Sequence, residues 1–292
     1  MKKLLTSQNQ HPAPALLAGL GPATPGLLGH LGAALHTLHR ANPPLAWAGW
    51  ANVGLAVLAL GLLPLDQRHV AGALVWMKPL KFAVSIAVYA FTLAWLLASL
   101  PAAAQGAVRC IGWGVAVSMV VEQAVIFGQA ARGTTSHYNA ASALDGALFG
   151  LMGLFILVNT VLTAWALYLA WRYQPQGSAG YVWGVRLGLL VFWVGSVLGG
   201  IMIRRAQHTV GGPDGGPGLP GLGWSTRAGD LRIAHFLGMH ALQALPLLGW
   251  ALGRWWPGQA AGLTWLGAAA YAAAVAALLV QALAGVPLWA GR

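Results

Sequence analysis

The chain has 292 residues, of which 58% are hydrophobic and only 7% are charged. Because a typical soluble domain carries about 25% charged residues, this composition excludes a water-soluble globule of this size. The formal net charge is +11, but the basic residues stand singly between apolar stretches, which argues against nucleic-acid binding and favours anchoring at lipid headgroups. Cys110 is the single cysteine, so an internal disulfide and a thiol-based metal site are excluded as well.

Residues 1–44 are predicted to be an N-terminal extension. The first residues resemble the start of a signal peptide, but prolines and polar residues interrupt the continuous apolar stretch that such a peptide needs. Residues 25–40 are expected to form a short interfacial helix, with Pro25 at its start. Residues 45–292 are expected to form a single transmembrane helical domain.

Seven apolar segments follow the extension, each long enough to cross a bilayer core of roughly 30 Å as a helix. The predicted segments are 45–64, 73–99, 108–131, 144–171, 181–203, 231–253 and 261–287. The sequence therefore predicts an all-α, polytopic integral membrane protein, a bundle of seven transmembrane helices in a lipid bilayer.

Glycines spaced four residues apart indicate close helix packing in two segments. The fifth segment has Gly184 and Gly188, then Gly195 and Gly199, and the fourth has Gly146 and Gly150. Small residues at this spacing let helix backbones approach each other in lipid. With 40 glycines in the chain, each pair alone is a weak signal.

The long Gly/Pro-rich connection at 205–229 is interpreted as an ordered lid or re-entrant loop, with a flexible surface loop as the alternative. Within it, residues 216–221 match the dinucleotide-binding fingerprint literally. No strand precedes the match, and its prolines remove amides that would cradle phosphate, so the match is attributed to chance.

Polar residues concentrate on one membrane face, here called side B, where the first, third and fifth segments end. All five histidines outside the extension lie on side B or just inside it. Polar residues also form stripes along the second, third, fourth and sixth segments, and such stripes should face the bundle interior. The stripes comprise Lys78, Lys81, Ser85, Tyr89 and Thr92; Ser118, Glu122 and Gln129; Asp145, Asn159 and Thr163; and Arg232, His235, Met239 and Gln243.

Glu122 is the only glutamate of the chain. Counted along the predicted segments, Lys81, Glu122 and His240 lie on the order of 12–15 Å below the side-B surface. A lone buried carboxylate is costly unless it is paired, so Glu122 is hypothesised to lie near Lys78 or Lys81; a purely structural polar bridge is the alternative. Pro79 is expected to kink the second segment, unless the helix starts later than predicted.

The histidines allow a metal or haem site. His235 and His240 are five residues apart, which is a poor spacing for one metal on one helix. His137, His208 and one of these two could still converge from three segments, so a metal ion or haem is a possible cofactor and hydrogen-bonded or acid–base histidines are the alternative. Ser136 and His137 are not predicted to form a nucleophile–base pair, because adjacent side chains rarely face each other.

The leading functional hypothesis is a membrane-embedded enzyme that opens on side B and acts on a lipid-like or membrane-soluble substrate. The candidate catalytic residues are Glu122, His240, Lys81, His137 and Asp145. The candidate substrate-binding residues, some of them arginines suited to an anionic group, are Lys78, Arg132, Asn159, Arg204, Trp224, Arg232 and Gln243. The candidate metal ligands are His137, His208, His235 and His240.

A transporter or channel is the alternative function, because the stripe on the second segment extends to Thr92, most of the way across the membrane. A ligand-sensing or assembly protein ranks third, since no signalling domain is visible. The basic residues divide almost evenly between the two sides, and the positive-inside rule slightly favours a cell-membrane protein with a cytoplasmic N-terminus.

Overall fold

The computed structural model describes residue 32 and residues 36–289. Within these residues, seven helices are long and apolar enough to cross a membrane, which confirms the all-α seven-helix membrane bundle. The helices are α3 (Pro43–Leu62), α4 (Met77–Ala98), α5 (Gln105–Ala131), α6 (Ala143–Arg172), α7 (Ala179–Arg205), α8 (Leu231–Trp255) and α9 (Ala260–Leu283). Most of the predicted interfacial helix, residues 25–40, lies outside the described residues.

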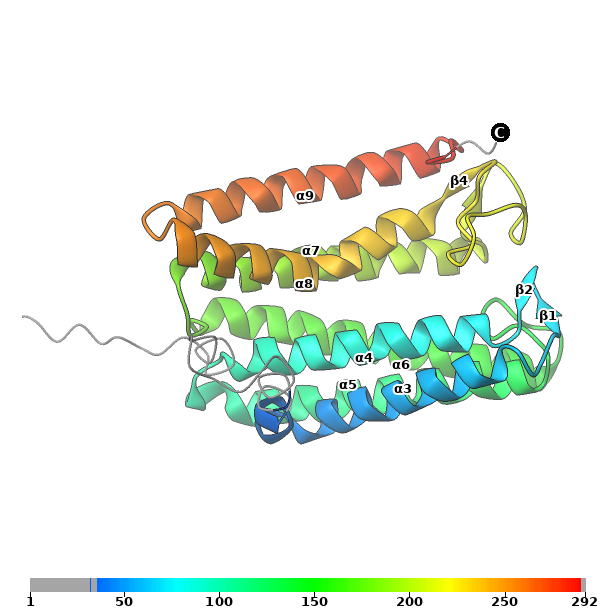
Figure 1. The fold of residues 1–292 in the computed structure, drawn as a ribbon, viewed down its shortest axis with the longest axis horizontal. Helices are drawn as coiled ribbons and strands as arrows, with labels where there is room; N and C mark the ends of the chain where they lie inside the picture. Colours follow the sequence, from blue (N-terminus) through cyan, green and yellow to red (C-terminus); the bar gives the residue numbers. More distant parts are fainter. Residues whose placement is uncertain (1–31, 33–35, 290–292) are drawn as a thin grey trace, which may run out of the picture.

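Two small antiparallel hairpins and a short helix join these helices, and residues 36–41 ahead of α3 are also helical. β1 (His69–Val70) pairs with β2 (Ala73–Leu74), and β3 (Thr209–Val210) pairs with β4 (Gly229–Asp230). The 3-10 helix η1 (Ala102–Ala104) leads into α5. Both hairpins lie at the same end of the bundle (Figure 1), which is side B.

Side-chain caps set the starts of four membrane helices. The caps accept a hydrogen bond from a backbone amide in the first turn and thereby satisfy a group that has no partner inside the helix. They are Asn42 for α3, Ser142 for α6, Ser178 for α7 and Asp230 for α8.

The start of α4 differs from the prediction. The segment was predicted to begin at residue 73, but Ala73 and Leu74 form β2 of the β1–β2 hairpin, and α4 begins only at Met77. Lys81 therefore lies about one turn inside the helix, near 6–8 Å, and the predicted depth of 12–15 Å for Lys81 was wrong. Pro79 falls in the first turn, where its missing N–H breaks no hydrogen bond, so the structure gives the later helix start in place of the kink.

The seven helices form two groups, α3–α6 and α7–α9, packed along a common axis (Figure 1). α6 packs against α7, and α4 meets α8, where the groups join. A buried apolar core crosses this junction. Tyr89 of α4 stacks on Phe192 of α7, with ring centroids 5.5 Å apart and planes at 12°, and its hydroxyl donates to Asn159 Oδ1 of α6 at 2.9 Å.

α7 and α8 are in direct backbone contact. A Cβ atom built on Gly184 would lie 2.4 Å from the carbonyl oxygen of Leu245, and one on Gly249 would lie 2.1 Å from that of Gly180. A Cβ atom on Gly195 would lie 2.7 Å from the carbonyl carbon of Gly238. The predicted role of the glycines of the fifth segment thus agrees with their packing, whereas Gly146 and Gly150 face open space and mediate no close contact.

The alternation of spans makes a direct prediction about side chains at the two ends of α6. Ala140 precedes α6 at side B, Gln174 follows it at the other end, and both are exposed. In a Cys110→Ser background, Ala140→Cys and Gln174→Cys should react with a membrane-impermeant maleimide from opposite faces of sealed vesicles. Mass spectrometry of each labelled protein measures the result; labelling of both from one face would contradict a crossing by α6.

Candidate functional site

The polar residues of side B form two separate clusters, and a third polar network lies deeper between the helices. The Glu122 cluster comprises Lys78, Glu122, Ser136 and His137. The loop cluster comprises His208, Asp214, Asp230 and Arg232. The mid-bundle network comprises Thr92, His240 and Gln243.

Glu122 projects from α5 toward the loop that joins α5 to α6. Its Oε1 lies 3.6 Å from Nε2 of His137, and the carboxylate side chain is only 4% exposed. Its Oε2 is buried and has no hydrogen-bond partner among the described residues. Lys78, in the first turn of α4, interacts electrostatically with this carboxylate, as the sequence suggested, but the direct contact is made by His137.

His137 is held by aromatic rings on two helices and is joined to Ser136. Its ring contacts Phe82 of α4 and Phe149 of α6, with centroids 5.5 and 6.3 Å apart. On its other edge, Nδ1 lies 3.1 Å from the hydroxyl oxygen of Ser136. Burial, together with the positive charge of Lys78, lowers the pKa of His137 well below its ordinary value, so the imidazole is neutral at neutral pH.

The contact between Ser136 and His137 corrects the interpretation that these neighbours would face apart. Successive side chains diverge in a regular helix or strand, but residues 132–142 form neither. Tyr138, the next residue, has a φ of 56°, in the left-handed region that L-residues rarely occupy. The irregular backbone turns the serine hydroxyl and the imidazole toward the same place.

A cavity of about 110 Å³ opens beside this cluster. Its wall includes the β1–β2 hairpin, the start of α4 and the end of α5, and it contains lysines and hydroxyls but no carboxylate. The polar lining residues are Lys78, Lys81, Thr134, Thr135 and Ser136. Ser136 thus lines the cavity and contacts His137, which in turn contacts Glu122; neither His137 nor Glu122 is a lining residue.

Asp145 and Arg132 close the two ends of the same loop. Arg132 forms an ion pair with Asp145 at 2.7 Å, and Gln129 donates to the same carboxylate at 2.8 Å. Ser142, the cap of α6, donates to its second oxygen at 2.6 Å. Asp145 was a candidate catalytic residue and Arg132 a candidate substrate-binding residue. Both are thus engaged in holding the loop that carries His137.

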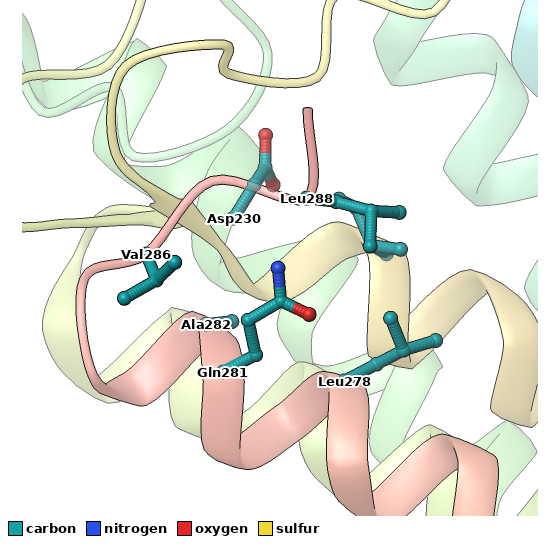
Figure 2. A pocket seen from close by; sticks show the side chains of 7 residues that line it. Asp230, Leu278, Gln281, Ala282, Val286 and Leu288 are labelled. Atoms are coloured by element: carbon teal, nitrogen blue, oxygen red, sulfur yellow. The ribbon is translucent and has the colours of Figure 1, made fainter. Parts of the chain in front are cut away.

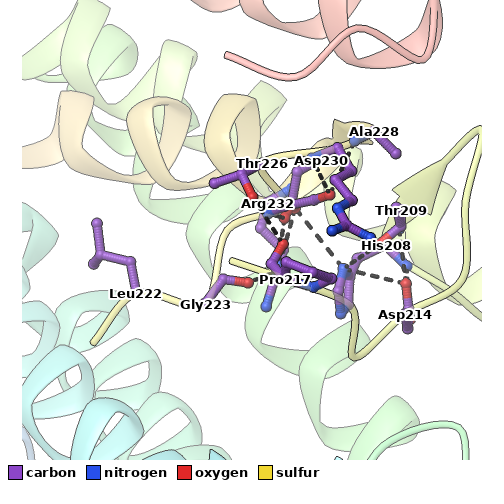
Figure 3. A network of polar contacts seen from close by, with 12 residues as sticks. His208, Thr209, Asp214, Pro217, Leu222, Gly223, Thr226, Ala228, Asp230 and Arg232 are labelled. Atoms are coloured by element: carbon purple, nitrogen blue, oxygen red, sulfur yellow. Dashed lines mark hydrogen bonds and ion pairs between the residues drawn. The ribbon is translucent and has the colours of Figure 1, made fainter. Parts of the chain in front are cut away.

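The loop cluster fastens the long connection between α7 and α8 (Figure 3). Asp230, fully buried, pairs with Arg232 at 2.6 Å and accepts from the backbone amide of Ser225 at 2.9 Å. Burial alone would raise the pKa of Asp230, but the hydrogen bonds and charge of Arg232 and the amide of Ser225 hold it below its ordinary value. His208 lies 3.3 Å from Asp214 and 3.8 Å from Asp230.

The same connection is tied to the cavity wall through Lys81. The ammonium of Lys81 donates to the carbonyl oxygens of Gly221 and Leu222, each at 3.2 Å. Trp224 packs edge-on against Phe236 of α8, with centroids 5.5 Å apart. These contacts support the interpretation of an ordered lid. Arg204, a candidate substrate-binding residue, is exposed at the end of α7 and belongs to neither the Glu122 cluster nor the loop cluster.

The C-terminal segment, which follows α9, packs near the base of the lid. Figure 2 shows a shallow hollow where Gln281 of α9 lies beneath the C-terminal segment, near Asp230. Gln281 donates to the carbonyl oxygen of Pro287 at 3.0 Å, and the backbone of Gly229 abuts Ala282. The hollow is otherwise apolar and contains no paired reactive groups, so it serves packing.

The mid-bundle network places two predicted site residues away from the Glu122 cluster. Nδ1 of His240 lies 3.2 Å from Oε1 of Gln243, whose amide nitrogen donates to Thr92 of α4 at 3.1 Å. Asn159 is engaged with Tyr89, as described above. This network joins the two helix groups between α4 and α8.

The four candidate metal ligands are not brought together. His137 contacts Glu122, His208 contacts two aspartates, His235 contacts the carbonyl oxygen of Gly195 at 2.8 Å, and His240 contacts Gln243. Across residue 32 and residues 36–289, no group of three or more histidine, cysteine, aspartate or glutamate side chains is arranged to hold a metal ion.

Ser136 is the residue of this site that the sequence analysis set aside. Its only sequence signal is its place in the polar run Thr134-Thr135-Ser136-His137 at the end of the third span. No known protein family model, curated protein or solved structure matches this chain.

Proposed function

We propose that the chain is a membrane-embedded enzyme that uses the Glu122 cluster for proton transfer to and from an amphipathic substrate. The observation that supports this most strongly is that the two oxygens of the Glu122 carboxylate have different surroundings. One oxygen contacts an imidazole and the other is buried without a partner in the described structure. A carboxylate kept only for structure is expected to have its oxygens satisfied.

The chemistry of the cavity favours a substrate with negative charge or electronegative oxygens. Two ammonium groups and three hydroxyls border it, and no acidic side chain does. Lys81 is already engaged with the lid, whereas Lys78 donates no hydrogen bond within the residues that the structure describes. Lys78 is therefore the group best suited to attract a carbonyl, carboxylate or phosphate oxygen.

The location of the cavity favours a substrate that reaches it along the membrane. The cluster lies within the side-B halves of α4 and α5 and in the loop that follows α5. An acyl chain can stay in the lipid while its polar head enters the cavity. The proposed substrate is accordingly a lipid or another membrane-soluble molecule with a polar head.

Lipid conversion in proteoliposomes tests the proposal. The purified protein should change the mass-spectrometric profile of a total bacterial lipid extract, and both Glu122→Gln and His137→Gln should reduce that change by a factor of about 10² or more, the usual contribution of a general acid–base group. Ser85→Ala, an exposed hydroxyl of α4 outside the cluster, is the matched control. A profile that the wild-type protein leaves unchanged, or that both variants change as much as the wild type does, would contradict the proposal.

A transporter is the second candidate, favoured by the mid-bundle network between the two helix groups. Thr92, Gln243 and His240 carry polar contacts to the middle of the junction between α4 and α8. Thr92→Val should then abolish solute or proton flux into liposomes, while an enzyme at side B should tolerate this change. Flux that depends on Thr92, without lipid conversion, would favour the transporter.

For its location we propose the cell membrane, with the N-terminus in the cytoplasm and side B facing away from it. The near-equal division of basic residues supports this only weakly. In intact cells, the cysteine at position 140 should then react with an impermeant maleimide and the cysteine at position 174 should not.

A further inference from the structure

We infer that Ser136 is the nucleophile of this site and that the substrate is a carboxylic ester, whose acyl group is carried transiently on the serine hydroxyl. This inference rests on the proposed membrane-embedded enzyme and specifies its reaction class. It goes beyond proton transfer because it assigns a covalent intermediate to one named oxygen.

The order of groups at the cavity supports the assignment. Ser136 is a lining residue of the cavity, Nδ1 of His137 lies 3.1 Å from its hydroxyl oxygen, and Oε1 of Glu122 lies 3.6 Å from the other nitrogen of the same ring. A serine hydroxyl becomes a useful nucleophile when a neighbouring base takes its proton and a third group orients that base. The roles, and not the fold or the chain order, define such an arrangement.

The other two hydroxyls at the cavity lack this support. Thr134 accepts a hydrogen bond from Asn139 at 3.0 Å, and within the described part of the chain neither Thr134 nor Thr135 places its hydroxyl against an imidazole. Ser136 is thus the one cavity hydroxyl described with a base beside it.

The charges and burial around His137 suit a general base. His137 is neutral because burial and the charge of Lys78 disfavour its protonated form, so Nδ1 can accept a proton when the other nitrogen carries the hydrogen toward Glu122. The groups that face the ring are Glu122 from α5, Lys78 and Phe82 from α4, Phe149 from α6 and the adjacent Tyr138. Once protonated, the ring is next to a carboxylate that stabilises it.

The reaction balances with water as the only co-reactant. The oxygen of Ser136 bonds to the ester carbonyl carbon as its proton passes to Nδ1 of His137, and Lys78 offsets the negative charge that forms on the carbonyl oxygen. The carbon–alkoxy bond then breaks, and the leaving oxygen takes the proton from Nδ1 to become an alcohol. A water molecule gives one proton to Nδ1 and bonds to the acyl carbon; the acyl–serine bond breaks, the proton returns to Ser136, and a carboxylic acid is released.

Covalent labelling with a fluorophosphonate tests the nucleophile without knowledge of the ester. The full-length wild-type protein in detergent should gain one phosphonyl group with loss of fluoride, and peptide mapping should place it on Ser136. Ser136→Ala should abolish the adduct, and His137→Gln should slow labelling by about 10²-fold or more. Ser85→Ala, which removes a hydroxyl with no imidazole beside it, should label like wild type.

Three labelling results would contradict the inference. An unlabelled wild-type protein, an adduct on another residue, or labelling of Ser136 that proceeds at an unchanged rate in His137→Gln would overturn the inference. The lipid assay separates this failure from failure of the proposed function. If Ser136→Ala still converts lipid while Glu122→Gln does not, the enzyme remains and the serine intermediate is refuted. If the wild type converts no lipid, or if every variant converts lipid as the wild type does, both proposals fail.

Discussion

Replacement of Gly249 by alanine should lower the unfolding midpoint of the protein in detergent by about 6–12 °C. The added methyl carbon would lie 2.1 Å from the carbonyl oxygen of Gly180, far inside contact distance, so α7 and α8 have to move apart. Overpacking of this kind costs about 1–3 kcal/mol and occasionally more, and for a chain of this size about 3 kcal/mol corresponds to that shift. Loss of monodisperse protein on heating measures it.

Gly200→Ala is the matched control for this substitution. Gly200 lies on α7, but a Cβ atom there would meet no other atom within 4 Å. Since alanine is the better helix former, the control should unfold at or slightly above the wild-type temperature. Equal midpoints for Gly249→Ala and the wild type would show that the two backbones are not in contact.

Removal of the Asp230 carboxylate should release the lid. Asp230→Ala leaves Arg232 and the amide of Ser225 without their acceptor, at a cost of about 3 kcal/mol, the low end for a broken buried pair because Arg232 is partly exposed. This is a factor of roughly 10² in the opening equilibrium. Trypsin should therefore cut after Arg227, an exposed residue of the lid, about 10²-fold faster at low protease concentration, where opening and closing are fast relative to cleavage.

Asp66→Ala is the control for the lid. Asp66 binds Arg68 and Trp76 beside the other hairpin, so its loss should leave cleavage after Arg227 at the wild-type rate. Accelerated cleavage in both variants would show a general loosening in place of a local one.

The pH dependence of the lid follows from the same carboxylate. Because the pKa of Asp230 is lowered in the folded state, its contribution to stability is fully present above the ordinary value of 3.8 and is lost only as the pH falls through the lowered value. The lid should stay closed to an acid-active protease such as pepsin at pH 4 in the wild type, whereas Asp230→Ala should be cut there.

The helices were predictable from the sequence because each crossing needs a long apolar run. The prediction erred mainly where another structure is equally apolar. Ala73 and Leu74 form a strand of the hairpin but fit the hydropathy of a helix start, and this placed Lys81 one turn too deep. The glycines of α7 were also readable, but nothing local distinguished them from Gly146 and Gly150, because only the neighbouring helix decides which face needs small residues.

The sequence indicates at which side of the bundle the candidate site lies, but not which of its side chains contact each other. Span alternation placed Glu122 in the side-B half of α5 and His137 in the loop that follows α5, so both belong to the same half of the bundle. The pairing of Ser136 with His137 depends on an irregular loop with a left-handed residue at Tyr138. Hydrophobic periodicity predicts helices and strands but not the conformation of such a loop. Arg132 and Asp145 illustrate the converse, because residues with reactive side chains are used to close that loop.

The touching backbones of α7 and α8 determine how this molecule can move. Carbonyl oxygens that already meet the opposite glycines leave no layer of side chains to rearrange, so α7 and α8 can only tilt together, as a rigid block. Tilting is possible at the junction with the first four helices, where rings such as Tyr89 and Phe192 can slide. Since the lid is joined to that block at both ends and to α4 through Lys81, any tilt of the block would strain the two Lys81 hydrogen bonds first.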